Sequence, residues 1–421
     1  MKPFKSLAKT AIFTGFAIVL AGTAIAETNL TIESWRSEDA DIWNKQIIPA
    51  FEKAHPGIKV KFTPMAPTEY NAALNAKLEG GNAGDIIVCR PFDVSLGLYE
   101  KGYLEDLTNV EGLANYPEFA KAAWSTDDGK TTFCIPMASV IHGFIYNKEA
   151  FNEVGVEVPK TEDEFFAILE KFKEDGNYIP LAMGTSDQWE AATMGYTNIG
   201  SNYWKGEKGR KNLIAGIEKF TDPQYVAAFE TLAKWADYMA EGFASQSYSD
   251  SQLQFTLGRA AIYPAGSWEI NGFNKDADFE MGAFYPPVKN EGDTCYITDH
   301  TDIGIGVNAN GKNKEAAMAF ISWVTSEEFA TIFGNALPGF FPLSNYALEL
   351  NDPLAQAFLS WRGECQGTIR NYYQILNRGT PALGNELWIT SANVINGTQT
   401  PEQAAKQLQD GLDAWYKPAV Q

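Results

Sequence analysis

The residues best suited to ligand chemistry follow the ends of expected strands. Trp35 ends an alternating strand over residues 30–35, and Arg36, Ser37 and Glu38 follow it and precede a helix. The loop offers an aromatic ring, a guanidinium fork and hydrogen-bond acceptors, which together suit a ligand rich in hydroxyl groups. The competing interpretation is a helix N-terminus whose acids complement the helix dipole.

Arg90 and Asp93 follow a second expected strand, the apolar run over residues 85–88. Parallel strands place their carboxyl ends along one edge of a sheet, where open sheets bind ligands. Both residues are therefore candidate ligand contacts. A purely structural Arg–Asp pair is the alternative.

The sharpest candidate is Trp268, which follows Gly266 and Ser267. Glycine lets the backbone approach a ligand closely and sets the turn that aims the next side chain. An indole there can cover the apolar face of a sugar ring. Packing of Trp268 in a core is the competing interpretation.

Other candidates come from segments expected to meet the same cleft. Ser139 and His142 lie in an extended segment, and Trp189 lies in a polar loop after a strand-like run. Core packing or chain turning explains several of these side chains equally well. The remaining candidates are His300, Phe340 and Arg378.

Catalytic and metal-binding patterns are not evident. The sequence holds no Gly-x-Ser-x-Gly elbow, His-Glu-x-x-His helix or Walker loop. A secreted glycosidase would need two carboxylates flanking the scissile bond, and no motif singles out such a pair. The three His and four Cys are scattered, so we expect no metal, no cofactor and no catalysis.

Residues 1–26 have the features of an export signal. Three Lys precede an apolar run over 11–22, and Ala24-Ile25-Ala26 gives a small-x-small cleavage pattern. The run is too short to span a bilayer of about 30 Å. The cut is not followed directly by a cysteine, since the first one in the chain is Cys89, so we expect a periplasmic protein without a lipid anchor.

Length and charge narrow the class of protein. Removing 26 of 421 residues leaves 395, enough for two domains. The remaining chain carries 30 basic and 53 acidic side chains, a formal charge of −23. This charge argues against nucleic acids and anionic membrane surfaces as partners. Export permits disulfides among Cys89, Cys134, Cys295 and Cys365, with three complete pairings that the sequence does not rank.

The mature chain alternates strand and helix patterns. Strands around residues 30, 60 and 86 separated by helices predict a parallel sheet with helices on both faces. Capping boxes at Thr161 and Thr400 mark two later helix starts. Extended segments near 135–137 and 285–288 are the expected crossings between domains.

Short motifs spread along most of the chain resemble the carbohydrate-binding solute receptors of ABC importers, the group that includes maltose-binding protein. They include His55-Pro56-Gly57-Ile58-Lys59-Val60, Tyr146-Asn147-Lys148, Gly258-Arg259-Ala260-Ala261-Ile262, Gly266-Ser267-Trp268 and Asn396-Gly397-Thr398-Gln399-Thr400-Pro401. The resemblance implies an α/β fold, namely the two-lobe periplasmic-binding-protein fold with a hinge and an inter-lobe ligand cleft. It also implies a monomer that delivers a small-molecule ligand, a sugar or sugar derivative, to membrane permease subunits.

The expected lobes use the chain discontinuously. Lobe 1 would hold residues 27–136 plus about 289–330, and lobe 2 would hold 137–288 plus about 331–421. Where relatives often carry an aromatic or acidic residue after the third strand, this chain has Cys89 and Arg90. Three arginines, Arg36, Arg90 and Arg378, would suit an acidic or sulfonated sugar. A polyamine or a phosphorylated polyol stays open as an alternative ligand.

Overall fold

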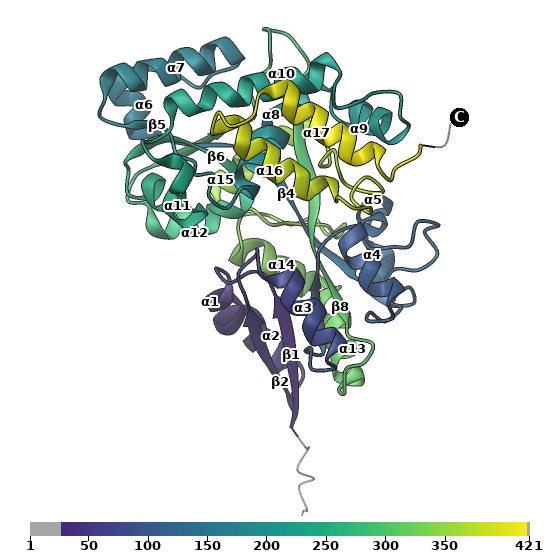
Figure 1. The fold of residues 1–421 in the computed structure, drawn as a ribbon. Helices are drawn as coiled ribbons and strands as arrows, with labels where there is room; N and C mark the ends of the chain where they lie inside the picture. Colours follow the sequence, from purple (N-terminus) through teal and green to yellow (C-terminus); the bar gives the residue numbers. More distant parts are fainter. Residues whose placement is uncertain (1–26, 419–421) are drawn as a thin grey trace, which may run out of the picture.

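The computed structural model describes residues 27–418, which form two lobes connected by long strands (Figure 1). The expected export signal, residues 1–26, lies outside the described residues. The first lobe begins with β1 (Thr28–Ser34), α1 (Ala40–Ile42), α2 (Ile48–Ala54), β2 (Ile58–Pro64), α3 (Tyr70–Glu79), β3 (Ile86–Cys89), α4 (Asp93–Glu100) and α5 (Glu118–Ala122).

The parallel sheet predicted for this region is confirmed. β1 lies between β2 and β3 and runs parallel to both. Alternating apolar residues of β1, such as Leu30 and Ile32, are fully buried, and β3 is buried along its whole length. The carboxyl ends of β1 and β3 therefore lie side by side and deliver Trp35 and Arg90 to the same edge.

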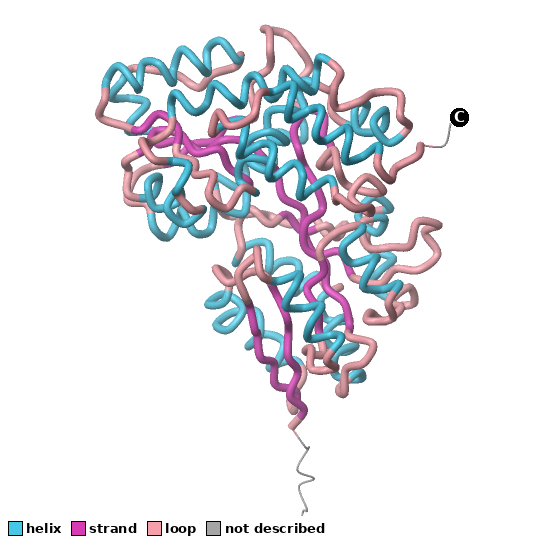
Figure 2. The backbone as a smooth tube through the Cα atoms, viewed as in Figure 1, coloured by secondary structure: helices cyan, strands magenta, loops and turns pink. Residues whose placement is uncertain are grey.

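Two antiparallel strands, β4 (Ile135–Asn147) and β8 (Tyr296–Val307), run through both lobes. Residues 135–141 of β4 pair with β8, whereas residues 142–146 pair with β6 (Ala260–Gly266) of the second lobe. The far end of β8 pairs with β3. One sheet thus continues from lobe to lobe, as the strands in Figure 2 show.

The second lobe fills the chain between these strands and the C-terminal part. Its first elements are α6 (Lys148–Val154), α7 (Glu162–Asp175), β5 (Ile179–Leu181), α8 (Thr197–Tyr203), α9 (Glu207–Ile214), α10 (Pro223–Ala233), α11 (Tyr248–Thr256), β6, α12 (Ile270–Asp276) and β7 (Met281–Phe284). The later ones are α15 (Pro353–Ser360), β10 (Gln366–Thr368), α16 (Leu383–Ile395) and α17 (Pro401–Asp413). Both predicted capping boxes, at Thr161 and Thr400, are present.

The position of the second crossing differs from the expected one. Residues 285–288 stay in the second lobe, because Val288 exchanges backbone hydrogen bonds with the start of α7: its N–H donates to Lys160 O, and Glu162 N–H donates to Val288 O. The chain crosses inside β8 instead. Two consecutive prolines end β7 but do not mark a lobe boundary.

The first lobe also reaches further along the chain than residue 330. After β8, the chain forms α13 (Lys314–Val324), α14 (Glu327–Ala336) and β9 (Phe341–Pro342). Phe329, Phe333 and Leu343 pack into the same core as β1 and β3. The chain returns to the second lobe before Leu354 of α15, which joins the core around β6.

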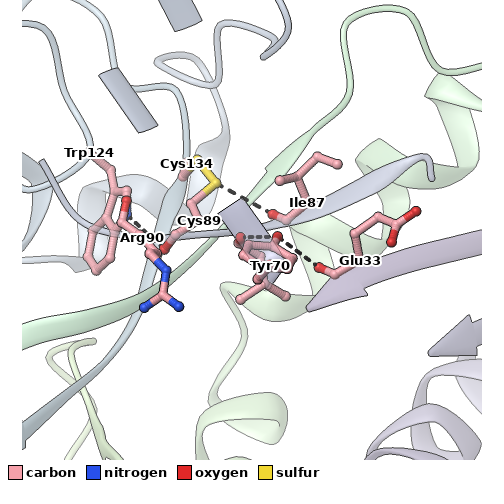
Figure 3. Close-up of a disulfide and its surroundings, with 8 residues drawn as sticks. Glu33, Tyr70, Ile87, Cys89, Arg90, Trp124 and Cys134 are labelled. Atoms are coloured by element: carbon pink, nitrogen blue, oxygen red, sulfur yellow. Dashed lines mark hydrogen bonds between the residues drawn. A yellow bond between two sulfur atoms is a disulfide. The ribbon is translucent and has the colours of Figure 1, made fainter. Parts of the chain in front are cut away.

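Two disulfides lie next to the starts of β4 and β8, the hinge strands that connect the lobes. Cys89 at the end of β3 bonds to Cys134, which directly precedes β4 (Figure 3). Cys295 directly precedes β8 and bonds to Cys365. Among residues 27–418, no helix is long and apolar enough to cross a membrane.

Candidate functional site

A cavity lies between the lobes beside the hinge. The first lobe supplies side chains that follow β1, β2 and β3, the second lobe supplies aromatic side chains, and β8 supplies one acid. The lining residues are Trp35, Arg36, Glu38, Pro67, Thr68, Arg90, Trp189, Thr193, Tyr248, Trp268, Asp302, Arg370 and Trp388. The structure therefore brings together six sequence-predicted candidates: Trp35, Arg36, Glu38, Arg90, Trp189 and Trp268.

Arg36 is fixed by its own loop. Its Nε–H donates to Asp39 Oδ2 at 2.6 Å, and a second nitrogen donates to Asp39 Oδ1 at 3.0 Å. Burial alone would lower the pKa of Arg36, but Asp39 and Glu38 outweigh it and raise the pKa above its usual value. Asp39 is buried behind this contact. The guanidinium lies 4.7 Å from the ring centroid of Phe340, so that buried ring supports Arg36.

Arg90 stacks on the indole of Trp35, with its guanidinium carbon 4.4 Å from the ring centroid. Its Nε–H donates to Asn71 Oδ1 and another nitrogen donates to Pro67 O, both at 3.0 Å. Cation–π stacking and two hydrogen bonds hold the side chain in one orientation. The first-lobe wall is therefore an ordered aromatic and cationic surface.

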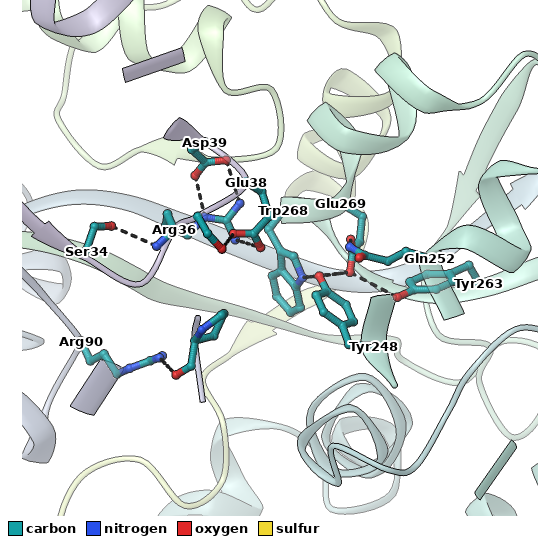
Figure 4. Close-up of polar contacts among 12 residues, drawn as sticks. Ser34, Arg36, Glu38, Asp39, Arg90, Tyr248, Gln252, Tyr263, Trp268 and Glu269 are labelled. Carbon is teal, nitrogen blue, oxygen red and sulfur yellow. Dashed lines mark hydrogen bonds and ion pairs between the residues drawn. The ribbon is translucent and has the colours of Figure 1, made fainter. Parts of the chain in front are cut away.

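The second-lobe wall is aromatic and is held from behind by Glu269 (Figure 4). Tyr248 O–H donates to Glu269 Oε1 at 2.7 Å, and Trp268 Nε1–H donates to the same oxygen at 3.1 Å. Gln252 donates to Oε2 at 2.8 Å. Burial raises the pKa of Glu269 to about 7, even though the hydrogen bonds from Tyr248 and Gln252 lower it.

The rings of this wall contact one another. Trp189 packs edge-on against Tyr248 at a centroid distance of 4.7 Å, and its centroid lies 6.5 Å from that of Trp268. Half-buried aromatic rings around a cavity suit the apolar faces of a sugar or polyol.

Gly266 has a different role from the one that its sequence context suggested. A Cβ at this position would lie 2.0 Å from Cζ3 of Trp268, so the missing side chain provides the space for that indole. Its φ of −100° is accessible to any residue. The hydroxyl of Ser267 is used inside the protein, because it accepts from Ile141 N–H and donates to Gly339 O.

His142 and His300 lie behind the cavity, one on each hinge strand. Their Nε2 atoms are 3.1 Å apart, and both rings are buried. Burial lowers the pKa of both well below the usual value. The ring of His142 packs edge-on against Trp268 at 5.3 Å, so the pair supports the wall and does not line the cavity.

Four other predicted candidates lie outside the cavity lining, namely Ser37, Asp93, Ser139 and Arg378. Ser139 accepts a hydrogen bond from Arg362 in a separate groove. Arg378 binds Asp93 and Asp127 through short ion pairs, away from the cavity. Ser37 is exposed and donates to Glu38.

Sequence reasoning did not select four prominent lining residues: Tyr248, Asp302, Arg370 and Trp388. Arg370 and Trp388 belong to the C-terminal part, which long-range packing carries back to the hinge. A basic residue two positions before a pair of tyrosines, Tyr372 and Tyr373, was the available signal for Arg370. Nothing in the local pattern separates Tyr248 from an ordinary first residue of a helix.

The side chains around this cavity can hold a ligand by ring stacking, hydrogen bonds and ion pairs. No group of three or more His, Cys, Asp or Glu in residues 27–418 has the arrangement of a metal site. Of the two carboxylates that line the cavity, Glu38 already lies 3.5 Å from a nitrogen of Arg36.

The chain is similar to known sugar-binding proteins in sequence and in structure. It is 24% identical over 313 residues to the multiple sugar-binding protein of Streptococcus mutans, covering 71% of this chain and 72% of that one. Its structure resembles a chitin oligosaccharide binding protein (TM-score 0.79, 21% identity, 92% of this chain and 98% of that chain covered). It also resembles the bacterial solute receptor AcbH (TM-score 0.81, 18% identity, 93% and 100% covered).

These structural likenesses show the two-lobe α/β fold. The family of bacterial extracellular solute-binding proteins matches residues 46–357, which is most of the chain. The chain therefore belongs to the bacterial extracellular solute-binding proteins.

Proposed function

We propose that this protein is the receptor of an ABC importer and binds a sugar, an oligosaccharide or a related polyol in the cavity between its lobes. The observation that carries the proposal is the cavity itself. Four tryptophans and a tyrosine line it together with guanidinium and carboxylate groups. Rings cover the apolar faces of a sugar while charged groups bind its hydroxyls. The Streptococcus mutans relative, a multiple sugar-binding protein, supports the same ligand class.

Binding would be coupled to lobe movement about β4 and β8. Each lobe supplies one wall, so a ligand that contacts both walls favours the closed arrangement. A loaded, closed receptor offers the permease subunits a different surface from an empty one. We propose that it acts as a monomer in the periplasm, after cleavage of residues 1–26 and without a lipid anchor.

The cavity disfavours a polyamine as the ligand. Arg90 and Arg370 share one facing carboxylate, Asp302, so a polycation would meet net repulsion in that part of the cavity. We also propose that the protein does not alter its ligand, because it must release it unchanged to the transporter. Mass spectrometry after prolonged incubation should recover the ligand intact, whereas turnover beyond one equivalent would favour a glycosidase.

A thermal-shift screen of neutral sugars, sugar acids, polyols, polyol phosphates and polyamines tests the ligand class. A specific ligand raises the stability by RT ln(1 + [L]/Kd). Stabilisation by carbohydrates or polyols supports the proposal, and stabilisation by polyamines alone would overturn it.

Trp268→Ala tests the site. Loss of one stacking aromatic should weaken binding of the best ligand by about 10- to 100-fold, by analogy with interface hot spots. Because Trp268 is only half-buried, unliganded stability should fall much less than in Trp235→Ala. Trp235 is fully buried in the second-lobe core, where truncation costs about 3–5 kcal/mol. Calorimetric titration and thermal unfolding measure both quantities.

Trp235→Ala is the control for affinity as well, because its side chain lies outside the cavity lining. If Trp268→Ala loses stability to the same extent as Trp235→Ala and keeps its affinity, Trp268 is a core residue and the assignment fails.

A further inference from the structure

Two of the arginines in the cavity lack the carboxylate partner that four other arginines have. Arg36, Arg210, Arg362 and Arg378 each form an ion pair with a carboxylate. Arg90 and Arg370 have no carboxylate within ion-pair distance among residues 27–418, although both line the cavity and are largely shielded from solvent. The seventh arginine, Arg259, is exposed.

Neutral groups hold both side chains in place. Arg90 donates to an amide oxygen and a backbone carbonyl and stacks on Trp35. Arg370 donates to the hydroxyl of Tyr373 at 3.0 Å and lies 5.4 Å from that ring centroid. These contacts fix the orientation of two charges without neutralising either. Leaving a buried charge uncompensated is costly.

The charges around the two guanidinium groups do not cancel. Burial lowers the pKa of Arg90, Arg370 lowers it further by repulsion, and Asp302 acts in the opposite direction. Asp302 also acts on Arg370, so one carboxylate faces two cations at longer range. The other lining acid, Glu38, belongs to Arg36, which Asp39 also neutralises. This corner of the cavity therefore keeps a surplus of one positive charge.

Two buried donors at the cavity also lack acceptors. Arg370 Nε–H and Trp388 Nε1–H have no hydrogen-bond partner among residues 27–418. Both groups donate only. An anionic acceptor that reached either donor would satisfy it and add a compensating charge, whereas a neutral hydroxyl is a weaker acceptor and adds no charge.

We propose that the ligand carries one anionic group, which binds between Arg90 and Arg370. The inference rests on the proposed function, because it takes the rest of the ligand to be a sugar or polyol that stacks on the aromatic wall. The anionic group can be a carboxylate, a sulfate or sulfonate, or a phosphate ester, which share the oxygens that guanidinium groups bind.

Matched ligand pairs test the proposal on the unmodified protein. Isothermal titration should compare glucose with glucuronate, glucose 6-sulfate and glucose 6-phosphate, and galactose with galacturonate. We expect at least one acid to bind about 10-fold or more tightly than its neutral parent, since charge-assisted hydrogen bonds are about twice as strong as neutral ones. The carboxylate, sulfate and phosphate compounds tell the sources of the anion apart.

Two variants locate the anion. Arg370→Gln and Arg90→Gln should each lower the affinity for the preferred acid by about 10-fold or more and reduce its preference over the neutral parent. Arg362→Gln is the matched control, because Arg362 pairs with Asp299 and lies outside the cavity lining. It should leave the preference unchanged.

The outcomes separate this inference from the proposed function. If neutral sugars bind as tightly as their acids, or if Arg370→Gln and Arg90→Gln keep the full preference for the acid, the anion site is overturned and the sugar receptor stands. If only polyamines bind, the proposed function itself fails. Unfolding curves of both variants establish that any loss of affinity occurs in folded protein, and the ligand comparison on the wild type remains decisive if a variant does not fold.

Discussion

Glu269 is the residue on which the second-lobe wall depends, because one carboxylate binds both Tyr248 and Trp268 from behind. It has only about 2% of its surface exposed, and few solvent molecules can stabilise its charge. Its pKa of about 7 means that the wall carries a proton at mildly acidic pH and loses it near neutrality.

The protonation of Glu269 predicts a pH-dependent stability. The folded pKa of about 7 lies above the ordinary value of 4.5, so between these values the folded state binds a proton that the unfolded state has released. Stability from this group is fully present below about 4.5 and falls as pH rises towards 7. As pH rises across this range, the unfolding free energy of the wild type should therefore fall by up to about 3 kcal/mol relative to that of Glu269→Gln.

Denaturant titrations of both proteins at several pH values between 4 and 8 measure this difference. Gln keeps the shape of the side chain and does not titrate, so other groups cancel in the comparison. A difference that stays constant across the range would show that Glu269 titrates normally.

Gly266 predicts a second effect at the same wall. Gly266→Ala would push the indole of Trp268 out of its place, since the new Cβ overlaps Cζ3 and Cη2 of the ring. We expect weaker ligand binding and a shift in tryptophan fluorescence. Gly272→Ala on α12 is the control, because nothing lies within 4 Å of its Cβ position. Equal affinities of the two variants would contradict this account.

At the scale of elements, Ser267 connects three segments. Its hydroxyl accepts from Ile141 N–H on β4 and donates to Gly339 O, just before β9. Ser267→Ala leaves both backbone groups buried without this partner, which costs about 1–3 kcal/mol per group. Chemical denaturation should show that loss. Ser360→Ala removes only a local, exposed bond to Ala357 O and should be nearly neutral, so similar losses in both would refute the link.

Elements whose signals are local could be predicted from the sequence. Alternating apolar residues from Leu30 onward predicted the parallel sheet, and Thr161 and Thr400 predicted helix starts, because neighbours in sequence determine both. The loop after β1 followed from the same rule. The site residues that these strand ends deliver, Trp35 and Arg36, were found in this way.

Features that depend on distant contacts could not be predicted. Pro286 and Pro287 end a strand in any context, so they said nothing about which lobe the next residues join. Arg370 reaches the cavity because the C-terminal part packs beside the hinge, and no local pattern records that path. The donor and acceptor of Ser267 lie more than 70 residues away, which makes a structural serine look like a loop serine.

At the scale of the whole molecule, Arg378 joins the lobes. It follows Leu376, which is buried in the second-lobe core, and its guanidinium binds Asp93 at 2.6 Å and Asp127 at 2.7 and 2.8 Å in the first lobe. Figure 1 shows α4 of the first lobe next to the C-terminal segments. These contacts stabilise the arrangement in which both cavity walls face one ligand.

Arg378→Gln should weaken ligand binding modestly. Partly exposed ion pairs contribute about 0.2–1 kcal/mol, so the Kd should rise by about 1.4- to 5-fold. The salt dependence of the Kd should also decrease, because screening acts on these charges. Lys406→Gln, which removes an ion pair within α17, is the control. An unchanged Kd, together with unchanged X-ray scattering of the unliganded protein, would show that Arg378 does not influence the lobe arrangement.

The disulfide pattern has a consequence for biogenesis. Cys89 bonds to Cys134 and Cys295 bonds to Cys365, so each cysteine pairs with the next one to leave the ribosome. An oxidase that joins cysteines in order of appearance would produce the native pattern directly, without isomerisation. The first bond can close before β8, α13 and α14 have been synthesised to complete the first lobe. We therefore expect production in an oxidising compartment to depend on a disulfide oxidase and to tolerate the loss of a disulfide isomerase.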